Sequence, residues 1–96
     1  MTALIRSYES GRFILHTEEG REEYRSKQEA LENGKSKLED FARKRMLQDQ
    51  VAEPLIEFSF EEKSAKTRGG EDIHLETLLY LRATGRPNVC QQSWII

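Results

Sequence analysis

One stretch without proline decides the fold: residues 18–48 read EEGREEYRSKQEALENGKSKLEDFARKRMLQ. Strong helix formers dominate this stretch, and one set of positions recurs with the spacing of helical turns. The residues on this face are Tyr24, Leu31, Gly34, Leu38, Phe41, Ala42, Arg45 and Met46. Glutamates gather near the start and basic residues near the end, which complements the helix dipole. The pattern predicts one long amphipathic helix over residues 18–48.

Two features bear on whether this helix is continuous. Asn33-Gly34 is a dipeptide that often marks a turn, and Ser26 with Glu29 has the spacing of a capping box, which would start the helix later. We favour one continuous helix because the apolar face stays in phase across Gly34. A glycine inside a helix costs about 1 kcal/mol relative to alanine. Its presence here therefore indicates that a strand or a second helix approaches closely.

Apolar and polar residues alternate in several segments outside this stretch, which is typical of half-buried strands. The predicted strands cover residues 3–8, 12–17, 55–62 and 72–84. A turn near Glu9 to Gly11 joins the first two, and a turn signal at 85–88 follows the fourth. The final residues, VCQQSWII, form a possible fifth strand.

These segments predict an α+β fold in the order β-β-α-β-β, with a possible fifth strand. A single helix against an antiparallel sheet is the two-layer arrangement that buries one face of each. The 96 residues fit one domain, with a flexible hairpin loop at about 62–72 and a C-terminal tail at 86–96. The second face of the sheet is then open to solvent, a partner or a second copy. No motif ties the chain to a known family.

Composition narrows the class of function. Fifteen basic residues nearly balance seventeen acidic ones, giving a net charge of −2. No overall field therefore favours nucleic acid or an anionic membrane. Cys90 is the single cysteine, so a reducing compartment is the simpler interpretation. No apolar run reaches the roughly 18 residues of a membrane span, and the first residues lack a signal-peptide core. We expect a small, acidic, cytoplasmic protein with no cofactor, no metal and no membrane partner.

Catalysis has no recognisable signature in this sequence. Neither His16 nor His74 forms a known nucleophile motif with Cys90. Gly69-Gly70 precedes a strand instead of a helix, so it does not form a phosphate-binding loop. One face of the fourth strand carries His74, Glu76, Tyr80 and Arg82. This face could form a polar pocket, but cross-strand pairs on a solvated or interface surface are far more common. We expect the protein not to be an enzyme.

Protein association is the function that the sequence favours. The second face of the fourth strand is too apolar for simple solvation, and the chain ends on an apolar Trp94-Ile95-Ile96. The predicted partner-binding residues are Leu78, Tyr80, Arg82 and Trp94, with His74 and Glu76 at the periphery. We expect binding to another protein and a homodimer that forms through the sheet.

Nucleic-acid binding is the alternative. Its predicted contacts are Lys63, Lys66 and Arg68 of the hairpin loop, with Arg43 and Lys44 at the basic end of the helix. Four carboxylates flank the three loop cations: Glu61, Glu62, Glu71 and Asp72. The loop therefore has a local net charge of −1, and this hypothesis takes second place.

Overall fold

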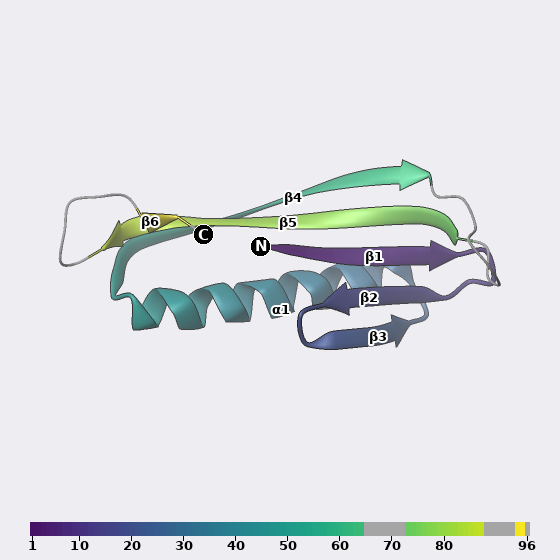
Figure 1. Ribbon diagram of the computed structural model, residues 1–96, viewed down its shortest axis with the longest axis horizontal. Helices are drawn as coiled ribbons and strands as arrows, with labels where there is room; N and C mark the ends of the chain where they lie inside the picture. The colour runs from purple at the N-terminus through teal and green to yellow at the C-terminus, as the bar shows by residue number, and fades with distance from the viewer. Residues whose placement is uncertain (65–72, 88–93, 96) are drawn as a thin grey trace.

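The sheet is antiparallel throughout, and one helix packs on a single face of it (Figure 1). The computed structural model describes residues 1–64, 73–87 and 94–95. Its elements are β1 (Thr2–Tyr8), β2 (Phe13–Thr17), β3 (Gly20–Tyr24), α1 (Lys27–Gln48), β4 (Val51–Ser64), β5 (Ile73–Pro87) and β6 (Trp94–Ile95). The strand order is β3-β2-β1-β5-β4, and β6 pairs with β5. The predicted α+β architecture and the possible last strand are confirmed.

Strand β1 lies between its sequence neighbour β2 and the distant strand β5. In the register, Ile5 stands opposite Leu15 on one side and opposite Thr77 on the other. The Leu81 N–H also donates a hydrogen bond of 2.9 Å to the Met1 carbonyl. The first residue of the chain is therefore bonded to β5 in the middle of the sheet.

The predicted start of the helix at residue 18 is wrong, because β3 occupies the first part of that stretch. Gly20 has a φ of 132°, a backbone conformation that favours glycine, at the point where the chain turns from β2 into β3. The helix begins at Lys27, after Ser26, whose hydroxyl accepts a hydrogen bond of 3.1 Å from the Glu29 N–H. The helix start that the capping-box spacing indicated is therefore the one observed.

The helix buries every fourth residue along one narrow stripe. The buried residues are Ala30, Gly34, Leu38, Ala42 and Met46. Such a row winds slowly around the helix axis, so it can follow the twist of the sheet beneath it. The seven-residue pattern in the sequence predicts a wider apolar face, but Phe41 is 44% exposed and Arg45 is exposed as well.

Gly34 marks a close approach of helix and sheet, and the helix is continuous across it. A Cβ atom at this position would lie 3.2 Å from Leu15 Cδ1 and 3.3 Å from Leu79 Cδ2. The missing side chain thus lets α1 rest directly on β2 and β5. This confirms the interpretation of Gly34 as a position of close packing.

Strands β4 and β5 are longer than the alternation predicts. The turn signal at 85–88 does not end β5 there, because Arg86 pairs with Ala52 and Pro87 pairs with Val51. A side chain at Gly85 would collide with Val51, so glycine allows the two strands to continue. Residues 62–64 of the predicted loop belong to β4, and 65–72 lie outside the described residues.

We predict that Gly34→Val lowers the free energy of unfolding by about 1–3 kcal/mol, because the new methyl groups overpack against Leu15 and Leu79. Chemical denaturation at neutral pH measures the effect. Ser36→Val is the matched control, since Ser36 is an exposed residue of the same helix. Equal losses in the two variants would contradict close packing at Gly34.

Candidate functional site: the open face of the sheet

The sheet face opposite α1, here called the open face, gathers side chains from five strands. Its residues include Leu4, Arg6, Ile14, His16, Arg21, Glu23, Leu55, Glu57, Ser59, Glu61, Lys63, His74, Glu76, Leu78, Tyr80 and Arg82. These residues alternate along each strand with the ones that point toward the helix. Within the described parts of the chain, no element packs across this face (Figure 1).

An aliphatic centre lies on the open face where β1 and β5 meet. Leu4 stands directly opposite Leu78, and Ile14 lies on the adjoining strand β2. Tyr80 extends this centre along β5, and its hydroxyl lies 3.5 Å from Glu61 Oε2. These four residues are half-buried among their neighbours. Burial of the phenol, with the Glu61 carboxylate nearby, raises the pKa of Tyr80.

Charged and polar groups from β1, β2 and β5 adjoin this centre. Arg6 stands opposite Glu76, with Nε and Oε1 3.5 Å apart but without hydrogen-bond geometry. His16 lies beside Leu4, and its buried Nε2 has no hydrogen-bond partner. Burial lowers the pKa of His16, and the Arg6 and Arg21 cations lower it further, against the opposing effect of Glu76. The folded protein therefore favours the neutral imidazole.

The structure brings together most of the predicted partner-binding residues. Leu78 and Tyr80 belong to the aliphatic centre, and Glu76 belongs to the ion pair beside it. His74 and Arg82 are exposed on the same face, toward the two ends of β5. Trp94 pairs with Gly85 through β6, and its side chain lies outside the described residues.

Sequence reasoning missed the contribution of β1 and β2 to this face. The alternation in residues 12–17 places Ile14 and His16 on one side of their strand, but it does not reveal the neighbouring strand. The observed strand order places β1, which carries Leu4 and Arg6, between β2 and β5. The aliphatic centre is therefore a product of topology.

The structure does not bring the predicted nucleic-acid contacts together. Lys63 lies near the distal end of β4, whereas Arg43 and Lys44 lie in the last turns of α1, beside the start of β4. The thirteen residues from Val51 to Lys63 span about 40 Å of extended strand. Arg43 also forms an ion pair of 2.7 Å with Glu39. Lys66 and Arg68 lie outside the described residues.

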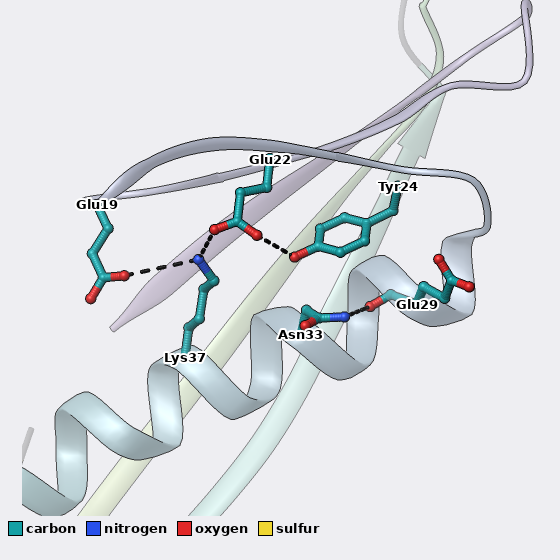
Figure 2. Close-up of polar contacts among 6 residues, drawn as sticks. All are labelled: Glu19, Glu22, Tyr24, Glu29, Asn33 and Lys37. Carbon is teal, nitrogen blue, oxygen red and sulfur yellow. Dashed lines mark hydrogen bonds and ion pairs between the residues drawn. The ribbon is translucent and has the colours of Figure 1, made fainter.

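A polar cluster on the helix side ties β3 to α1 (Figure 2). Lys37 forms an ion pair with Glu22 and lies 3.9 Å from a carboxylate oxygen of Glu19. The Tyr24 hydroxyl donates a hydrogen bond of 2.5 Å to the other oxygen of Glu22. Burial and this carboxylate raise the pKa of Tyr24 to about 12. Because these groups satisfy one another, we interpret the cluster as a structural link between the strand and the helix.

We predict that the free energy of unfolding falls as the pH drops through the His16 range. The folded state lowers the pKa of His16, so its contribution is present above the unfolded value of about 6.5 and is lost below it. Denaturation at pH 7.5 and pH 5.5 measures the change. His16→Leu should reduce this dependence, whereas His74→Leu, at an exposed position, should keep it. An unchanged pH dependence in His16→Leu would contradict the assignment.

Residues 1–64, 73–87 and 94–95 contain no group of three or more His, Cys, Asp or Glu side chains that could hold a metal ion. Their helix is not long and apolar enough to cross a membrane. Comparison of the chain with protein-family models, with curated proteins and with solved structures found no match.

Proposed function

We propose that this is a non-catalytic protein that acts by binding another protein and that it assembles as a homodimer. The observation that carries the proposal is the open face, which no described element covers, with the aliphatic centre formed by Leu4, Ile14, Leu78 and Tyr80. In a two-layer fold, only one face of the sheet is covered by the helix. A central apolar patch on the other face is typical of an interaction surface.

The distribution of residue types on the open face supports binding to a protein. Protein interfaces have an apolar centre and a polar rim, with tyrosine and arginine prominent among the residues that contribute most affinity. Here Tyr80 lies in the centre, while Arg82, His74 and Glu61 are exposed around it. A partner could therefore bury the centre and leave the charged rim in water.

The surface area of the chain is also consistent with a partner. The structure exposes 6860 Å², whereas a compact monomer of 11.2 kDa exposes about 5,700 Å². Its extents of 52 × 20 × 19 Å reflect an elongated shape. This elongated shape accounts for the larger area and leaves surface that a partner can cover.

The non-catalytic part of the proposal rests on how the titratable groups are arranged. Arg6 with Glu76, and Tyr80 with Glu61, form pairs across neighbouring strands, a usual stabilising arrangement of sheets. A sheet surface also does not enclose a small substrate as a cleft would.

We predict that Tyr80→Ala and Trp94→Ala weaken capture of a partner by the tagged chain, measured by pull-down with mass spectrometry. Ser36→Ala, on the exposed side of the helix, should leave capture unchanged. Light scattering over a concentration series should give the mass of a dimer. A monomer at roughly 1 mM, together with unchanged capture by both variants, would refute the proposed function.

A further inference from the structure

Among the strands that the structure describes, β4 leaves one long edge of the sheet unpaired. Its 14 residues bond to β5 on one side, and β4 stands last in the strand order. We infer that this edge pairs antiparallel with β4 of a second copy, which joins two sheets into one. The inference rests on the homodimer of the proposed function and assigns the contact that forms it. An unpaired row of backbone N–H and C=O groups is a template for another strand.

The two edges of the sheet differ in how well they resist such pairing. The opposite edge is β3, which has five residues, most of them charged and exposed: Gly20, Arg21, Glu22, Glu23 and Tyr24. Short and charged strands are protected against edge pairing. Strand β4 carries protection near both of its ends: Pro54 lies within a register shift, and the far end holds the charged Glu61, Glu62 and Lys63. Between them, residues 55–60 include a single charged residue, Glu57. From Leu55 to Ser64 the pairing of β4 with β5 is regular.

Apolar side chains along the regular part of β4 are incompletely covered. Phe60 is 56% exposed and Leu55 is 53% exposed. Ile56 and Phe58 are half-buried at the margin of the core, on the same side as Phe60. A second strand laid alongside would cover this row, which the helix of the same chain leaves partly open.

One register of self-pairing makes β4 complementary to itself. With Phe58 on the two-fold axis, Phe58 faces its own copy and Ile56 faces Phe60 of the second copy. On the other face, Glu57 meets Ser59 and Leu55 meets Glu61 of the second copy. No two like charges stand opposite each other between residues 55 and 61, and the apolar row becomes continuous.

The neighbouring registers lack this complementarity. An axis through Glu57 sets this carboxylate against its own copy, and an axis through Ser59 sets Glu57 against Glu61. An axis through Phe60 sets Phe58 against Glu62 of the second copy. In each chain Glu62 already forms an ion pair with Lys27 of the helix. Like charges directly opposite destabilise a strand pair, so the register centred on Phe58 is the favoured one.

The symmetry of this contact has a consequence for the open face. Two antiparallel copies of one strand are related by a two-fold axis perpendicular to the sheet. Both helices then lie on one side of the joined sheet, and both open faces lie on the other. The dimer would therefore present two aliphatic centres to a partner on a single continuous surface, which allows bivalent binding.

Sedimentation velocity on three lysine variants of the full chain tests the assigned contact. Phe60→Lys should raise the dimer dissociation constant about tenfold or more, because it sets a lysine against Ile56 of the second copy. Phe41→Lys is the matched control, since Phe41 is an exposed aromatic residue of the helix, away from β4. It should leave the constant unchanged. Leu78→Lys tests the alternative contact, a dimer that forms through the open face.

Disulfide cross-linking tests the register with exposed positions only. In a Cys90→Ser background, a mixture of the Glu57→Cys and Ser59→Cys chains should form a covalent dimer on oxidation, because these positions stand directly opposite, about 5 Å apart. Each chain alone should cross-link far more slowly, because equivalent residues are then diagonal neighbours at roughly 8 Å.

These experiments distinguish a failure of the β4 contact from a failure of the proposed function. Loss of the dimer in Leu78→Lys but not in Phe60→Lys would overturn the β4 contact and leave a dimer through the open face. Rapid cross-linking of Ser59→Cys alone would overturn the register. A wild-type chain that stays monomeric at every concentration would overturn both the contact and the homodimer, while partner capture would still test the open face.

Discussion

The close contact between α1 and the sheet at Gly34 is the constraint on which the rest of the structure depends. Leu15 and Leu79 fill the space that a side chain would occupy, so the helix and the two strands are held at short range. Ala30 and Ala42 continue the same stripe with small side chains. The two layers are thus close together, and the core between them is thin. A small domain with so thin a core buries a modest share of its total surface.

The parts of the fold that periodicity encodes could be predicted from the sequence. The long helix, its continuity at Gly34 and the two long strands follow from local patterns of 3.6 and 2 residues. Strand β3 could not be predicted in this way, because Arg21, Glu22 and Glu23 are good helix formers. Its pairing with β2 overrides that preference. The available signals were Gly20 and the cap at Ser26, and both indicated a boundary within the stretch.

Some residues of the candidate site could be predicted from the sequence, and others could not. Alternation within β5 predicts that Leu78 and Tyr80 share a face, and the structure places them together. The neighbours of these residues depend on strand order, which no local pattern encodes. For this reason Leu4 and His16 entered the site only with the structure. The position of β4 at an edge has the same origin, so the chemistry of its outer side could not be inferred from alternation alone.

The central position of β1 also governs the order in which the sheet can assemble. Its contacts with β2 are local, but its register with β5 joins Ile5 to Thr77. The mean sequence separation of contacts is therefore high for so small a chain, and folding should be slower than in a helical bundle of equal length. During synthesis, β1 emerges long before β5, so one of its sides stays unpaired in the interval. Nascent chains of this protein are consequently exposed to misassembly through β1 until β5 has formed.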